Sequence, residues 1–286
     1  MNVKMLREPV QVRRAILNFS GWSDAGDTGH LTLRDLKRAI WCEPAAVIDM
    51  DGFWDTDGLR PQVTIKHGRI QKMDWPAYSL SHCILPSEEA ILIGNGPEPT
   101  SNWRGFARSL LKVLKEWQCE EVVILGSMHD HIYHDELAFS GVAMDAEGLN
   151  RLHELGCEPL EEYQGPCAVH AAIMLEASER EMQAFSVWAH HPFYLSGPSE
   201  LIIATLLSML GGLLDVELDT GHLMDAWGER EREIEALIED NDEIRQTIES
   251  MRGDRKPARK HQPAGGPAKV VQFNEFLKRR HDPSND

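Results

Sequence analysis

Short apolar runs alternate with helix-length amphipathic segments along most of the chain. Runs of four to eight apolar residues that stop at Gly, Ser or charged residues predict buried strands. They lie at 15–19, 45–50, 90–94, 121–125 and 184–189. Helical spacing predicts helices at 28–41, from about 101 onward, at 169–181 and at 199–214, and weaker patterns at 63–70 and 78–85 suggest hairpin or edge strands. This alternation predicts an α/β domain with a largely parallel central sheet.

The last quarter of the sequence has a different pattern. Residues 1–218 form the expected α/β core domain, and 219–251 is predicted as a charged helical extension packed on that core. Residues 252–286 read as a basic linker rich in Pro and Gly with a short tail, and trypsin is expected to cut first between Arg252 and Lys260. A partner-binding role for the charged helix is the alternative to simple packing.

Composition excludes some partners. The 286 residues carry a formal net charge of −17, which argues against nucleic acid and anionic membrane surfaces, because both select basic proteins. The amino-terminal segment lacks the apolar core of a secretory signal, and no run approaches the roughly 20 apolar residues that span a bilayer. The expected location is therefore the cytoplasm. The five cysteines are scattered without a C-x-x-C pair, which favours reduced, mostly buried thiols.

Three of the predicted strands end in polar or glycine-containing loops, "SGWSDAG", "GNGPEP" and "GSMHDH". Loops at the carboxyl ends of parallel strands meet at one edge of the sheet, where ligands bind in such folds. The third loop nearly matches the H-x-H-x-D-H signature of binuclear metallohydrolases through His129, His131 and His134. Tyr133 occupies the aspartate position, so no metal is expected, and a polar loop whose histidines bond backbone groups is the preferred interpretation. His190 or His191, after another strand, could still contribute.

The other two loops carry incomplete motifs. "SGWSDAGD" lacks the lysine of a P-loop and the G-x-G-x-x-G spacing, and Asp24 and Asp27 would repel phosphate, so a tight turn with Asp27 or Thr28 as helix cap is expected. In "GPEPTSNWRGF", Glu98 and Arg104 could bind a ligand, but a structural ion pair is preferred. No serine lies in a G-x-S-x-G elbow, so no catalytic residue is assigned and no cofactor is expected.

Several segments together resemble a known family. "FSGWSDAGD", "GNGPEPTSNWRGF", "LGSM" followed by His134, "YQGPCAVHAAI" and "SVWAHHPFYLSGPSE" occur in this order. Their order and spacing over roughly residues 10–250 resemble the bacterial and archaeal branch of the proteasome assembly chaperone 2 family. The resemblance implies a three-layer α/β/α fold similar to nucleoside phosphorylases and self-association into homo-oligomers. It implies no known reaction. The chain departs from the family in ending "HDPSND", without the hydrophobic-tyrosine docking tail of proteasome-binding relatives.

The preferred interpretation is a non-catalytic, homo-oligomeric protein that acts through protein–protein contacts, with a proteasome-like or other protein client. The alternative is a small-molecule enzyme or binder that uses a phosphorylase-like crevice at the carboxyl edge of the sheet. The candidate residues of that crevice are Gly21, Trp22, Asp24, Asp27, Glu98, Arg104, His129, His131, His134 and His191.

Overall fold

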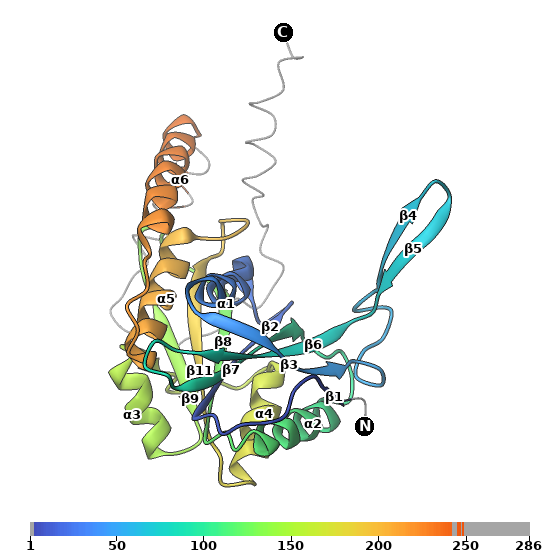
Figure 1. Ribbon diagram of the computed structural model, residues 1–286. Coiled ribbons are helices and arrows are strands. Elements are labelled where there is room, and N and C mark those ends of the chain that lie inside the picture. The colour runs from blue at the N-terminus through green and yellow to red at the C-terminus, as the bar shows by residue number, and fades with distance from the viewer. Residues whose placement is uncertain (1–2, 242–244, 247, 249–286) are drawn as a thin grey trace.

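The computed structural model describes residues 3–241, 245, 246 and 248, and a nine-stranded sheet forms its centre (Figure 1). The strands lie across the sheet in the order β1-β3-β6-β7-β2-β8-β11-β9-β10. Their bounds are β1 Val3–Met5, β2 Arg14–Ser20, β3 Trp41–Asp49, β6 Ala77–Ile84, β7 Ala90–Pro97, β8 Glu121–Asp130, β9 Phe139–Ala143, β10 Glu158–Pro159 and β11 Gln183–Pro192. The four central strands β7, β2, β8 and β11 are parallel, and antiparallel pairs attach β6, β3 and β1 on one side and β9 on the other.

Helices cover both faces of this sheet. They are α1 Thr28–Ala39, α2 Trp103–Glu116, α3 Ala146–Glu154, α4 Val169–Ser178, α5 Glu200–Leu214 and α6 Gly221–Asp240. One apolar cluster joins α2 and α4 to the first face, and a second joins α1, α3 and α5 to the other. The predicted three-layer α/β/α class is therefore confirmed, with a sheet that is parallel at its centre and contains antiparallel pairs on both sides.

Strand β2 shows why apolar runs predicted the central strands. Ala15, Leu17 and Phe19 enter the first cluster, and Ile16 enters the second. Because helices cover both faces, every one of these side chains is buried, and the run shows no polar alternation.

The predicted element ends differ from the observed ones in several places. Helix α1 ends at Ala39, and Trp41 already begins β3. The elements β1, β9, β10 and α3 were not predicted, because each has nine residues or fewer. Gly126 to Asp130 were predicted as a loop, which is wrong: β8 continues through them, paired residue for residue with β11.

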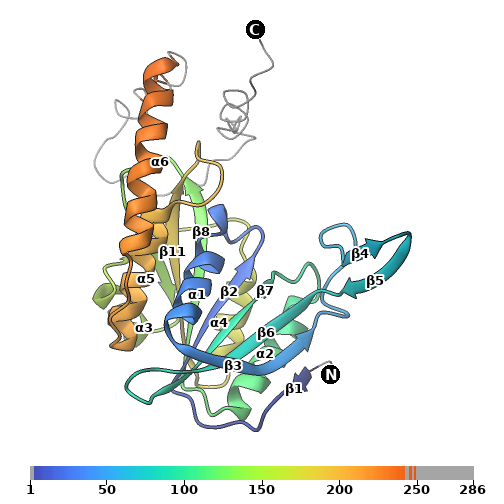
Figure 2. The same ribbon diagram turned by 45° about the horizontal axis from the view of Figure 1, so that its top comes forward.

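A two-stranded hairpin stands apart from the main sheet. Within the described part of the chain, strands β4 Gln62–Lys66 and β5 Arg69–Asp74 pair only with each other, and they project from the end of the molecule that holds β3 and β6 (Figures 1 and 2). His67 and Gly68 join them with φ of 50° and 73°, the left-handed pair that a tight hairpin turn requires. The predicted hairpin at 63–70 is thus longer than expected.

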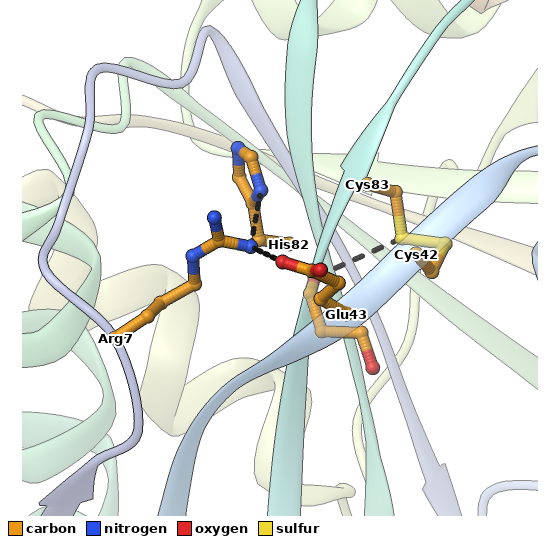
Figure 3. The surroundings of a disulfide bond; sticks show 6 residues. Arg7, Cys42, Glu43, His82 and Cys83 are labelled. Atoms are coloured by element: carbon orange, nitrogen blue, oxygen red, sulfur yellow. Dashed lines mark hydrogen bonds and ion pairs between the residues drawn. A yellow bond between two sulfur atoms is a disulfide. The ribbon is translucent and has the colours of Figure 1, made fainter.

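The prediction of unpaired cysteine thiols is wrong for two of the five. Cys42 and Cys83 lie directly opposite each other on β3 and β6 and form a disulfide (Figure 3). They are 41 residues apart in sequence, so only the strand register reveals the pair. Cys119 and Cys157 are buried thiols, as expected, and burial raises the pKa of Cys119 to about 12.

Polar side chains surround the disulfide. Arg7, after β1, forms an ion pair with Glu43 and places Nη1 3.2 Å from Nδ1 of His82 (Figure 3). The His82 ring lies against Trp117 with ring centroids 5.3 Å apart. Together with the disulfide, these contacts tie the segment after β1 to the β3–β6 pair.

Helix α6 packs on α5 and on the loops that follow β8 and β11. Arg230 forms a bidentate ion pair with Glu200, at 2.6 and 2.7 Å. Trp227 and Ile234 are buried in a third apolar cluster with Tyr133, Tyr194 and Ile248. In the described part of the chain, every helix is too short or too polar to traverse a bilayer. The linker, tail and trypsin site predicted at 252–286 lie outside the described residues.

Candidate functional site

The carboxyl ends of β2, β7, β8 and β11 lie at one edge of the sheet and carry the polar loops singled out in the sequence. These strands are parallel neighbours, so the loop after β2, the start of α2 and the end of β8 lie close together. An isolated bridge pairs Asp24 with Ser127, which joins the loop after β2 directly to β8.

Asp24 organises the loop after β2. Its carboxylate accepts hydrogen bonds from the backbone N–H groups of Gly29, at 2.7 Å, and His30, at 3.1 Å. The Ser127 hydroxyl lies 3.3 Å from the same group. Burial raises the pKa of Asp24, and the two backbone hydrogen bonds act against that rise. The carboxylate thus caps the first turn of α1 and is largely enclosed.

Other candidate residues of this loop face solvent. Trp22 is 65% exposed, and Gly21 has φ of 123° with open space where a side chain would begin. Asp27 is exposed with a left-handed φ of 53° and makes no side-chain cap bond. Asp27 thus occupies the expected N-cap position of α1, but the capping hydrogen bonds come from the carboxylate of Asp24, which precedes the short 3-10 helix at Ala25–Asp27.

Gly26 lies where the loop after β2 contacts β11. It has φ of 65°, and a Cβ built there would lie 2.5 Å from Nε2 of His191 and 2.8 Å from the carbonyl oxygen of Gly197. Only glycine combines this backbone conformation with so close a contact.

The substitution Gly26→Ala should lower the free energy of unfolding by about 2–4 kcal/mol, since it adds left-handed backbone strain to overpacking. Urea denaturation of both proteins at one concentration measures the change. Gly228→Ala is the matched control: beyond the neighbouring backbone of α6, no described atom lies within 4 Å of its added Cβ, and it should gain about 0.5–1 kcal/mol. A G26A protein as stable as the wild type would show that this loop does not lie against β11.

Glu98 and Arg104, on the second loop, do not form the expected ion pair. The Glu98 carboxylate accepts a hydrogen bond from the backbone N–H of Val169, the first residue of α4, at 2.8 Å. Burial raises the pKa of Glu98, and this hydrogen bond opposes the rise. Arg104 is exposed in the first turn of α2, and Asn102 caps that helix, accepting from Gly105 N–H at 3.3 Å.

The histidines of residues 129–134 point to different partners. His129 meets His191 edge to face, with ring centroids 5.3 Å apart, and His131 lies 4.7 Å from the Phe193 ring. His134 is buried, and its Nδ1 lies 2.9 Å from the Tyr194 hydroxyl. Burial lowers the pKa of His191 to about 4, with a further contribution from His129. Burial also lowers the pKa of His129, so both imidazoles favour the neutral state.

The described residues do not gather three or more His, Cys, Asp or Glu side chains into a group that could hold a metal ion. His129 and His191 come from the paired positions of β8 and β11, whereas His131 and His134 lie beyond the end of β8. The strand extension separates the rings that the sequence places side by side.

The sequence did not predict a hydrogen-bonded chain of three side chains, Asp130, His190 and Ser140. Nδ1 of His190 lies 2.7 Å from Asp130, and Nε2 lies 2.9 Å from the Ser140 hydroxyl. A carboxylate, an imidazole and a hydroxyl follow one another in the order used by serine hydrolases. Ser140, however, is 3% exposed within β9, so its oxygen has no open approach for a substrate. The three side chains connect β8, β11 and β9. The sequence indicated only His190, at the end of a predicted strand, because Ser140 is 50 residues away from it.

Two hollows in the surface lie away from this edge. One of about 550 Å³ is lined by Arg13, Arg14, Arg151 and the end of α5, at the start of β2. The other, of about 350 Å³, lies beside β1 and Trp75. Neither is lined by a candidate residue of the carboxyl edge. At the carboxyl edge itself, Asp24 and Glu98 accept hydrogen bonds from backbone N–H groups at helix starts, so these acids hold the loops together.

Solved structures of other proteins have the same fold as this chain. A proteasome-assembly chaperone homologue from Mycobacterium tuberculosis is 27% identical with a TM-score of 0.74, over 82% of this chain and 99% of that one. A PAC2 family protein from Streptomyces avermitilis is 28% identical with a TM-score of 0.70, over 82% and 98% of the two chains. An archaeal proteasome activator from Pyrococcus furiosus shares the fold alone, with 14% identity, a TM-score of 0.65 and coverage of 82% and 97%.

No curated protein has a significantly similar sequence. The model of the PAC2 family matches residues 18–238, which include the end of β2, the central strands β7, β8 and β11, and all six helices except the last two residues of α6. The match covers most of the chain, and the family of the solved relatives agrees with it. The chain therefore belongs to the PAC2 family.

Proposed function

We propose that the protein is a non-catalytic, homo-oligomeric interaction protein that assists the assembly of a proteasome-like particle. The observation that carries this proposal is the similarity to the M. tuberculosis proteasome-assembly chaperone homologue, which extends over 99% of that chain. The similarity therefore includes nearly the whole solved fold of that relative.

The arrangement of the carboxyl edge supports a role without catalysis. Asp24, which is buried, and Glu98, which is half-buried, each accept backbone hydrogen bonds at a helix start. His134 is bonded to Tyr194. Groups engaged in this way position loops and leave few polar atoms directed toward a small molecule.

The proposal also includes location and organisation. We place the protein in the cytoplasm, where the client of an assembly chaperone would be made. This location does not predict the Cys42–Cys83 disulfide, because such bonds are rare in reducing compartments. The division into a core at 1–218, a helical extension at 219–251 and a tail at 252–286 remains part of the proposal.

Reconstitution tests the client. The purified full chain is mixed with α-type proteasome subunits of its own organism, and ring formation is followed by native electrophoresis and sedimentation. A complex with the subunits and a higher yield of rings is the expected result, with an unrelated protein of similar negative charge as control. No complex at about 50 µM of each protein, a limit of about −6 kcal/mol, would contradict the proposed client.

A ligand-shift melting screen tests the absence of a small-molecule function. Nucleosides and inorganic phosphate are added at rising concentration to the purified protein. The proposal expects an unchanged melting temperature. A shift that grows with ligand concentration, as linkage requires for specific binding, would instead favour a small-molecule enzyme or binder.

A further inference from the structure

The β4–β5 hairpin has no partner of its own size in the described structure. Every residue of both strands is exposed, and the hairpin extends away from the main sheet (Figure 2). An isolated two-stranded hairpin is at best marginally stable in water. A hairpin of this length is therefore expected to lie against another surface.

One face of the hairpin is apolar. Val63 pairs with Met73 and Ile65 pairs with Ile70, and residues directly opposite each other share a face. Their exposed fractions are 48%, 42%, 59% and 69%, in that order. Trp75 continues the apolar surface at the base of the hairpin and is 58% exposed. A contiguous apolar patch of this kind marks a protein contact.

The hairpin is also basic within an acidic protein. Residues 62–74 hold three Lys or Arg and one Asp, a formal net charge of +2, whereas the whole chain carries −17. Two hairpins facing each other would place like charges together, which disfavours a hairpin–hairpin dimer. The complementary surface must be acidic and partly apolar.

Such a surface lies at the opposite end of the sheet. We define the acidic edge as residues 135–162, which include β9, α3 and β10. It holds eight Asp or Glu and one Arg, a formal net charge of −7. Four apolar side chains of the acidic edge are 37–45% exposed: Leu137, Val142, Met144 and Leu149. The acidic edge therefore combines negative charge with exposed apolar side chains, and these are the two properties expected of a surface that binds the hairpin.

The two surfaces cannot meet within one chain. The strand order puts β3 and β6 near one end and β9 and β10 at the other, and both views show the hairpin and α3 on opposite sides of the molecule (Figures 1 and 2). A contact between them must join two copies head to tail. Such heterologous contacts build closed rings when their rotation closes.

We propose that the apolar face of the β4–β5 hairpin of one copy docks on the acidic edge of a second copy. The docking rests on the self-association proposed above and names the two surfaces that form it. Apolar burial supplies the attraction, and the opposite charges select the partner surface.

Removal of the apolar face provides the first test. In Ile65→Glu/Ile70→Glu the hairpin becomes polar, while the core is untouched, so circular dichroism and the melting temperature should change little. Light scattering of this full-length variant should show a mass near the 32.3 kDa of one chain. The dissociation constant of its self-association should be at least tenfold higher than that of the wild type. Leu175→Glu, at a side chain of α4 that is 58% exposed, is the matched control and should keep the wild-type mass.

Charge exchange provides the second test. Lys66→Glu/Arg69→Glu/Lys72→Glu makes the hairpin acidic, and a separate protein with Glu147→Lys/Glu158→Lys/Glu161→Lys makes the edge basic. Each protein alone should sediment as a single chain, because like charges then face each other. An equimolar mixture should regain a mass of at least two chains, since each hairpin meets an edge of opposite charge.

The outcomes separate the two levels of the proposal. A wild-type protein of one-chain mass at every concentration would overturn both self-association and the docking. A wild-type oligomer that I65E/I70E leaves intact would overturn the docking alone. A mixture of the charge-exchanged proteins that stays at one-chain mass would overturn the assignment of the acidic edge as partner.

Discussion

Phe106→Ala is expected to lower the free energy of unfolding by about 3–5 kcal/mol, the usual cost of truncating a buried aromatic ring. Phe106 is fully buried on α2, where the helix packs on the first face of the sheet. Its ring contacts Phe19 and Tyr78 of the sheet, with centroid distances of 5.8 and 5.5 Å, and Phe53 at 5.6 Å. All three contacts are edge-to-face, which adds to the burial term.

Urea denaturation at a fixed protein concentration measures this loss as a lower midpoint with an unchanged slope. Phe106→Leu keeps most of the apolar volume and should lose less than half as much. Leu175→Ala, at an exposed site of α4, should stay within about 0.5 kcal/mol of the wild type. A loss in F106A no larger than in L175A would mean that α2 does not pack on Phe19 and Tyr78.

The sequence was most informative where burial depends on a continuous stretch of chain. The apolar run at 15–19 identified β2, because both of its faces contact helices and alternation is absent. Helix α5 was found for the same reason, with Ser199 as its cap: the hydroxyl accepts from Ile202 N–H at 3.5 Å.

It was least informative where a partner strand decides the structure. The polar residues 126–130 form a strand because β11 extends beside them up to Pro192, which no local pattern in either segment shows. The Cys42–Cys83 pair depends in the same way on the register of β3 and β6. Pairing across a sheet is a property of two segments, and a single segment does not contain it.

The candidate site was predicted at the right edge of the fold but with partly wrong partners. Asp24 and Glu98 were singled out as ligand or ion-pair groups, and both hold backbone N–H groups at helix starts. For Glu98 the helix begins 71 residues later, so sequence proximity favoured Arg104 instead. Polar residues at strand ends indicate where loops meet, but their partners follow from the packing of the helices.

His170 was not singled out, and it gives the second large expected effect. It is fully buried on α4, between Trp188 and Phe19, with ring centroids 4.7 and 5.9 Å away. Neither ring nitrogen has a hydrogen-bond partner among the residues that the structure describes. A buried polar group without a partner costs about 1–3 kcal/mol, so His170→Leu should raise the free energy of unfolding at pH 7.5 by about that amount.

The same substitution should reduce the sensitivity of the fold to acid. Burial lowers the pKa of His170 to about 3, from an ordinary 6.5, so the unfolded chain binds the proton more tightly than the folded chain. Stability is therefore complete above pH 6.5 and is lost as the pH falls from 6.5 toward 3. Within that window each such histidine contributes a slope of up to about 1.4 kcal/mol per pH unit.

His191, whose pKa is lowered to about 4 by burial, contributes to the same acid limb and remains in the variant. The H170L protein should therefore keep part of the slope, and its advantage over the wild type should grow as the pH falls from 7 to 5. Urea midpoints measured every half pH unit give both curves, and His153→Leu, at an exposed position of α3, is the control that should follow the wild type. Parallel curves for H170L and wild type would mean that His170 binds its proton equally in both states, and an H170L protein less stable at pH 7.5 would mean that its ring nitrogens are hydrogen-bonded in the fold.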